Sequence, residues 1–159
     1  MTLAEKITFP VVRRAAISYL AAVLLTYVLA SIFQSLCVLA VMVNAGADIS
    51  VGKWLYTIGH DLYGFTFSGV ISFGPAVMAG FIIAMPTAAI IHKFLGLPRW
   101  ILYPLAGATA MATILYIVKL NFYGATILPG TRGFIGFGLQ LLAGAFGGAV
   151  FATLSKQRP

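Results

Sequence analysis

Four long apolar blocks separated by short polar segments make up most of the chain. They run from about Ala15 to Val43, Phe65 to Ile91, Trp100 to Val118 and Gly133 to Leu154. A helix rises about 1.5 Å per residue, so about 20 apolar residues cross a hydrocarbon core of about 30 Å. None of the blocks has a charged residue inside it or alternates like a barrel strand. The pattern predicts an all-α bundle of four transmembrane helices, with residues 1–159 forming a single integral membrane domain.

A shorter segment after the first block has a different pattern. Its apolar residues recur at i, i+3, i+4, i+7 and i+11, as on one face of a helix: Val51, Trp54, Leu55, Ile58 and Leu62. We assign its polar residues to the opposite side: Lys53, Thr57, His60 and Asp61. We predict a short amphipathic helix in the outer membrane interface, anchored by Trp54. The alternative is an irregular loop packed on the ends of the spans.

Composition and charge narrow the class of protein. Apolar residues make up 61% of the chain and charged residues 8%, whereas a soluble domain has roughly 25% charged residues. The ten Lys and Arg residues are scattered, which excludes the clustered basic face of a nucleic-acid-binding protein. Seven of them flank the blocks on one side and three on the other. This bias predicts cytoplasmic N- and C-termini, and the minimal loops lead us to expect a bacterial inner membrane. Trp100 and Tyr103 then become interfacial anchors at the inner surface.

Small residues recur at every fourth position in two of the predicted spans. The second span has such a ladder at Ser68, Ser72, Ala76, Gly80, Ala84 and Ala88, and the fourth has one at Gly136, Gln140, Gly144, Gly148 and Ala152. Small side chains allow close packing of helices in a bilayer. We therefore expect the second and fourth spans to be central, each touching two neighbours. Pro75 and Pro86 lie inside the predicted second span and should kink it.

The outer half of the predicted bundle contains a candidate polar cluster formed by Gln34, Ser72 and Gln140. A buried amide without a partner costs about 2–7 kcal/mol, so these side chains need partners. One interpretation is that they hydrogen-bond one another and fix the register of the helices. The other is an outward-facing pocket for a neutral small solute or a lipid headgroup.

Residue sets that carry chemistry are missing from the predicted spans. No acid or base lies at membrane depth, and Cys37 is the one cysteine. His60 and His92 are predicted at opposite membrane faces, so we expect no shared metal or haem, no cofactor and no enzymatic activity. We predict a non-enzymatic accessory subunit of a membrane complex, or a homo-oligomer, with membrane lipids and other membrane subunits (or itself) as partners. The alternatives are a small transporter or channel protomer and, third, an enzyme acting on a lipid or quinone.

Overall fold

The computed structural model is helical throughout the part of the chain that it describes. This part comprises residues 3–48, 50–67, 73–121, 129–131 and 133–156, with side chains placed for all but 3–11 and 65–67. The elements are α1 (Leu3–Asn44), α2 (Val51–Phe67), α3 (Phe73–Leu95), α4 (Arg99–Asn121), the 3₁₀ turn η1 (Pro129–Thr131) and α5 (Phe134–Leu154). Within these residues, four helices are long and apolar enough to cross a membrane: α1 from Val12 onward, α3, α4 and α5. The predicted all-α, four-span architecture with an additional amphipathic helix is confirmed.

The start of the second span was predicted wrongly. Residues 65–67 form the last turn of α2, and α3 begins at Phe73 rather than at Phe65. The apolar run is continuous across this boundary, so hydropathy alone does not separate two helices there. Pro75 consequently lies in the first turn of α3, where backbone N–H groups have no partner within the helix and proline costs nothing. Pro86 lies inside α3 as expected.

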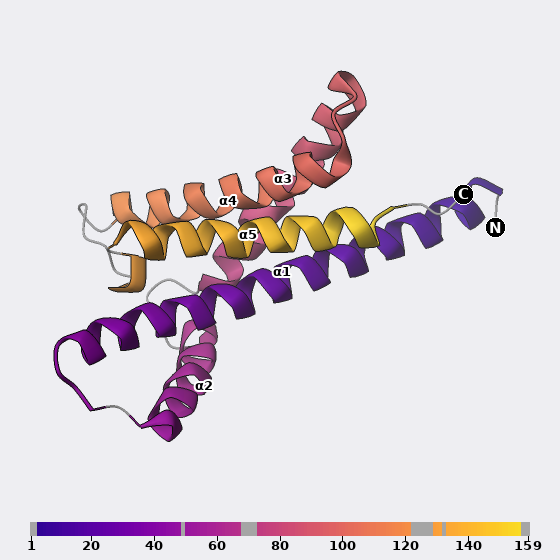
Figure 1. The fold of residues 1–159 in the computed structure, drawn as a ribbon. Helices are drawn as coiled ribbons and strands as arrows, with labels where there is room; N and C mark the ends of the chain where they lie inside the picture. The colour runs from indigo at the N-terminus through magenta and orange to yellow at the C-terminus, as the bar shows by residue number, and fades with distance from the viewer. Residues whose placement is uncertain (1–2, 49, 68–72, 122–128, 132, 157–159) are drawn as a thin grey trace.

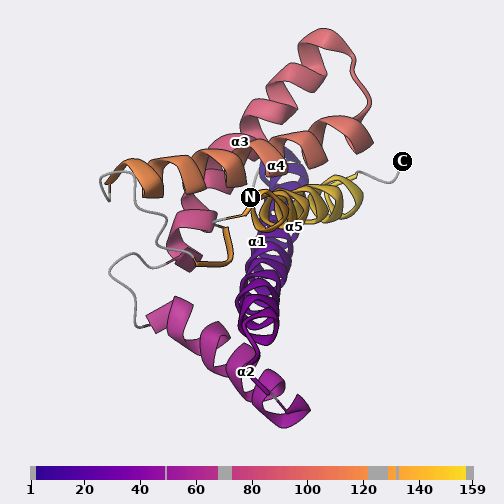
Figure 2. The ribbon, with the colours of Figure 1, turned by 60° about the vertical axis from the view of Figure 1, so that its left-hand side comes forward.

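Helices α4, α5 and α1 form the packed part of the bundle, with α5 between the other two (Figure 1). Helix α3 crosses them steeply and packs mainly on α4, while α2 contacts α1 through residues near the C-terminal end of α2 (Figures 1 and 2). We call the end that carries both termini the terminal end, and the opposite end the α2 end. The expectation that the second span is central is wrong: α3 buries one stripe only, formed by Phe73, Val77, Phe81, Met85 and Ala88. The fourth span, α5, is central.

Contacts along α1 and α5 place the two helices in register. Arg14 contacts Leu154 at the terminal end, and Gln140 bonds to Ala30 near the α2 end. The 21 residues of α5 are about 31 Å long, which matches the hydrocarbon core of a bilayer. A helix of this length that crosses a bilayer upright ends at the level where lipid headgroups begin.

Glycines bring the backbones of α4 and α5 together. A Cβ atom added at Gly107 would overlap the carbonyl of Gly144, and one added at Gly144 would overlap the carbonyl of Gly107. Gly148 approaches the carbonyl of Tyr103 equally closely. Backbones this close form Cα–H···O contacts, which recur at interfaces between membrane helices. The small-residue ladder of α5 is therefore occupied within the chain.

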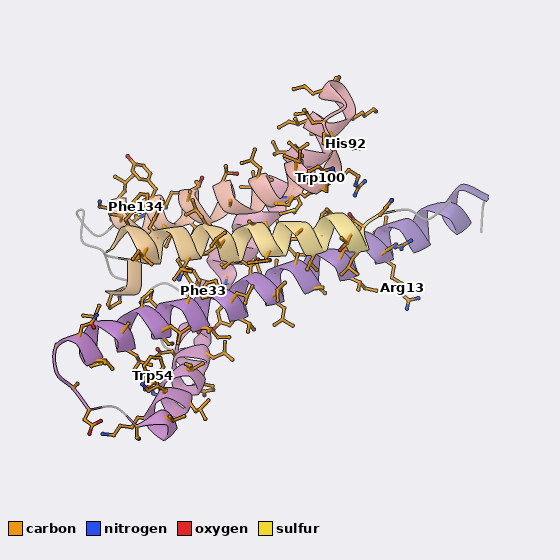
Figure 3. All side chains as sticks on the ribbon, viewed as in Figure 1. Arg13, Phe33, Trp54, His92, Trp100 and Phe134 are labelled. Carbon is orange, nitrogen blue, oxygen red and sulfur yellow. The ribbon has the colours of Figure 1, made fainter. Side chains whose placement is uncertain are left out.

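A three-residue link joins α3 to α4 and makes them antiparallel neighbours, as its length predicts. Gly96 adopts a φ of +66° after the last turn of α3, a conformation that favours glycine at a helix C-terminus. The Nδ1–H group of His92 donates to the carbonyl of Leu97 at 2.6 Å. His92, which lies at the terminal end (Figure 3), thus closes the link and is not free to act as a metal ligand through this nitrogen.

Candidate functional site

Buried polar side chains follow α1 along the faces that meet α5 and α2. We call them the α1 polar ridge: Ser18, Thr26, Ser31, Gln34 and Ser35. Gln140 of α5 is the one further buried polar side chain among the described residues. The ridge and Gln140 bring together two members of the predicted cluster, Gln34 and Gln140. Ser72, like Ser68, lies outside the described residues.

Gln140 ties α5 to α1 through the backbone rather than through Gln34. Its Nε2 donates to the carbonyl of Ala30 at 2.9 Å. The Oε1 atoms of both glutamines are buried and have no hydrogen-bond donor, so the two amides do not bond to each other. Of the hydrogen bonds expected within the predicted cluster, the structure contains one amide contact between α1 and α5, which Gln140 makes with the backbone of α1.

Four buried oxygen atoms of this region have no conventional partner: Thr26 Oγ1, Ser31 Oγ, Gln34 Oε1 and Gln140 Oε1. Two of them face glycine. A Cβ added at Gly147 would overlap Thr26 Oγ1, and one added at Gly130 would lie 2.6 Å from Gln34 Oε1. A Cα hydrogen of each glycine therefore points toward the oxygen and is a weak donor. With Gln34 only 3% exposed and Gln140 only 1% exposed, the α1–α5 part of the cluster is closed in this conformation.

Asp61 reaches the polar ridge from α2, which the sequence analysis did not predict. The Ser35 hydroxyl donates to Asp61 Oδ2 at 2.7 Å, and the Tyr27 hydroxyl donates to the carbonyl of Leu62 at 2.6 Å. The other carboxylate oxygen of Asp61 lies 3.9 Å from Nδ1 of His60, whose side chain is 68% exposed against 29% for Asp61. Asp61 thus connects a buried serine of a membrane-spanning helix with the surface.

The orientation of α2 differs from the prediction for a geometric reason. Seven residues advance a helix by about 700°, so Asp61 lies within about 20° of Trp54 and belongs to the same face. That face packs on α1, with Trp54, Ile58 and Asp61 partly buried, whereas Leu55 of the predicted apolar stripe is exposed. The seven-residue spacing from Trp54 was the signal that could have identified Asp61.

A large open groove runs between α3 and α4. It has a volume of about 680 Å³, and ten of its 18 lining residues are Gly, Ala or Thr. The set includes Ala76, Gly80, Ala84, Ala106, Thr109 and Thr113. The hydroxyls of Thr109 and Thr113 bond to carbonyls of their own helix. Three of the residues predicted to pack helices, Ala76, Gly80 and Ala84, therefore line this surface, while Gly144 and Gly148 lie inside the bundle.

The predicted aromatic anchors take different positions. Trp100 is 74% exposed at the terminal end, and Trp54 lies partly buried on α2 at the other end (Figure 3). The prediction for Tyr103 is wrong, because this residue is 2% exposed. Its ring packs on Phe151 with centroids 5.2 Å apart and lies under the Arg99 guanidinium. One turn of α4 separates an exposed tryptophan from a buried tyrosine, and hydropathy does not distinguish the two.

In comparisons with known proteins, no family model, no curated protein and no solved structure matches the chain. Among the described residues, no group of three His, Cys, Asp or Glu side chains is arranged to hold a metal ion. The features of the molecule that bear on its function are the packing of the helices, the α3/α4 groove and the contact between Asp61 and Ser35.

Proposed function

We propose that this protein is a non-enzymatic packing subunit of a membrane assembly and that the α3/α4 groove receives a transmembrane helix of another chain. The observation that supports the proposal is the groove itself, an open surface of small residues on two membrane-spanning helices. Lipid tails are as apolar as leucine, so helices associate in a bilayer through close packing, which small residues permit. The proposal includes a bacterial inner membrane with both termini in the cytoplasm.

The distribution of small residues favours the groove over the other helix faces. The glycines of α5 already contact α4 and α1 within the chain. On α3, by contrast, Ala79 and Thr87 line the groove and are exposed. A helix seated there would meet mainly the alanine and threonine side chains of α3 and α4. The partner helix comes either from a second copy or from a different subunit, and these two sources are separable by experiment.

A photoreactive amino acid placed at Thr109, which lines the groove and is exposed, tests the proposal in the native membrane. We expect a cross-link to one protein chain, whose mass shows whether it is a second copy. The matched control carries the photoreactive group at Ala89, an exposed position of α3 outside the groove. Equal cross-linking from both positions, or products with lipid alone at Thr109, would contradict the proposal.

Groove-filling substitutions give a second test. Ala79→Leu with Thr109→Leu should weaken the association by about 1–3 kcal/mol, or about 5- to 150-fold, because the added methylenes occupy the space of the partner helix. Ala89→Leu adds the same bulk as Ala79→Leu, but outside the groove, and should leave the association unchanged.

A second candidate function is a small transporter or channel protomer. It is favoured by Asp61, because this carboxylate reaches a buried serine of a spanning helix and ionisable groups at membrane depth mark solute and ion pathways. Because Gln34 and Gln140 are closed off, solute would enter only if α5 moved away from α1. Solute-dependent thermal stability that Asp61→Asn abolishes would support transport; its absence for ions and neutral solutes would remove this candidate.

A further inference from the structure

Two arginines from different helices meet at the C-terminal end of α5. Arg14 of α1 donates from Nε to the carbonyl of Leu154 at 3.0 Å. Arg99, the first residue of α4, donates from Nη2 to the hydroxyl of Ser155 at 2.7 Å. Because Leu154 and Ser155 are consecutive, both guanidinium groups lie beside the same helical turn.

These two charges have no carboxylate partner among the described residues. The described basic side chains at this end are Arg13, Arg14, Lys93, Arg99 and Lys156. The acids with described side chains, Asp48 and Asp61, belong to the segments at the α2 end, and the side chain of Glu5 lies outside the described set. The C-terminus of α5 contributes a partial charge of about −0.5, which offsets only part of two full positive charges. The site therefore favours an additional anion.

The arrangement of the two side chains suits a phosphate group. The Arg99 guanidinium carbon lies 5.0 Å from the ring centroid of the buried Tyr103, a cation–π contact that restrains the guanidinium group. Arg14 uses Nε for Leu154, which leaves its two terminal nitrogens without a bond to the described residues. Terminal nitrogens in a fixed fork match the oxygens of a phosphate.

The position of the site at the end of a membrane-spanning helix indicates that a lipid supplies this phosphate. The site lies at the end of the 31 Å length of α5, where headgroups of the bilayer begin, and the exposed apolar side chains of Trp100 and Leu154 lie beside it. We propose that Arg14 and Arg99 bind the phosphate of an anionic phospholipid in the leaflet at the terminal end. A zwitterionic lipid would bring its own cation to this basic region and should bind more weakly.

Fluorescence of Trp100 provides a local measure of lipid binding. In a Trp54→Phe variant Trp100 is the one tryptophan of the chain, and brominated lipids quench it on contact. We would reconstitute the full chain in vesicles that contain phosphatidylcholine and phosphatidylglycerol. In one sample the phosphatidylglycerol is brominated, and in the other the phosphatidylcholine is brominated. We expect about 5-fold or stronger preference for phosphatidylglycerol, the size given by one Arg near an anionic surface. Trp54, measured in Trp100→Phe, reports on the α2 end and should show no such preference.

Matched substitutions distinguish a built site from general attraction. Arg14→Gln with Arg99→Gln should remove the preference at Trp100, whereas Arg13→Gln with Lys93→Gln removes the same charge from the same end and should retain it. Should the Arg99 variant fail to fold, Arg14→Gln alone serves, because Arg14 is exposed. Equal losses in both double variants would overturn the proposal in favour of diffuse electrostatics. Competition by millimolar inorganic phosphate would overturn the assignment to a lipid.

Discussion

The close approach of α4 and α5 can be tested by adding a single methyl group. Gly144→Ala places a Cβ that overlaps the carbonyl of Gly107 and lies 2.5 Å from Met111 Cγ. The Met111 side chain can move, but the Gly107 carbonyl belongs to the backbone of a neighbouring helix, so the two helices must separate. Overpacking of this kind costs about 1–3 kcal/mol. In a chain of this length each kcal/mol changes Tm by about 2–4 °C, so we expect Tm to fall by about 2–12 °C.

Gly138→Ala is the matched control for this prediction. It lies on the same helix, and a Cβ added there meets nothing within 4 Å. Replacing glycine with alanine in a helix interior favours the helix by up to about 1 kcal/mol, so Gly138→Ala should leave Tm unchanged or raise it. Circular dichroism of the protein in bicelles during heating measures both variants. If Gly144→Ala is as stable as Gly138→Ala, the backbone contact between α4 and α5 is not present in solution.

Three further predictions follow from the polar contacts. Gln140→Leu removes the hydrogen bond to Ala30 and should lower the free energy of unfolding by about 0.6–1.7 kcal/mol. Gln34→Leu removes a buried oxygen that has no donor and should leave the stability unchanged or raise it. Equal losses of stability in thermal unfolding would contradict this assignment. Ser35→Ala with Tyr27→Phe removes two hydrogen bonds to α2. The rate of amide hydrogen exchange in Val51–Phe67 should rise several-fold, with α4 as the internal reference. Unchanged exchange would show that apolar contacts alone hold α2 against α1. Arg14→Ala removes a cation and a donor at the C-terminus of α5 at a cost of about 0.3–1 kcal/mol, visible as faster exchange in the last turn of α5, while Arg13→Ala should change nothing there.

The sequence predicted the helices well because their length and apolar character are set by the thickness of the bilayer. It also predicted the amphipathic helix, which depends on local pattern. It failed at Phe65–Phe67, where two helices share one apolar run, and in the choice of the central helices. Small-residue ladders occur on α3 and on α5, and periodicity shows that both can pack closely without showing which one is covered by the same chain.

The polar contacts were harder to predict because they join residues far apart in the chain. Gln140 bonds to a backbone carbonyl of α1, and no side-chain pattern marks that acceptor. Asp61 was assigned to the wrong face, although its seven-residue spacing from Trp54 indicates the face that packs on α1. Arg14 and Arg99 were interpreted only as basic flanks of spans, since their meeting at the end of α5 depends on the helix arrangement.

The central claim, that the α3/α4 groove is covered by a helix of another chain, is tested most directly by the mass of the assembly in its own lipids. Extraction with a polymer that retains the surrounding bilayer, followed by native mass spectrometry, keeps membrane subunits together. We predict a particle that contains this chain and at least one further protein chain, and we predict that it dissociates in the Ala79→Leu, Thr109→Leu variant. A particle containing one copy of this chain and lipids alone would contradict the account.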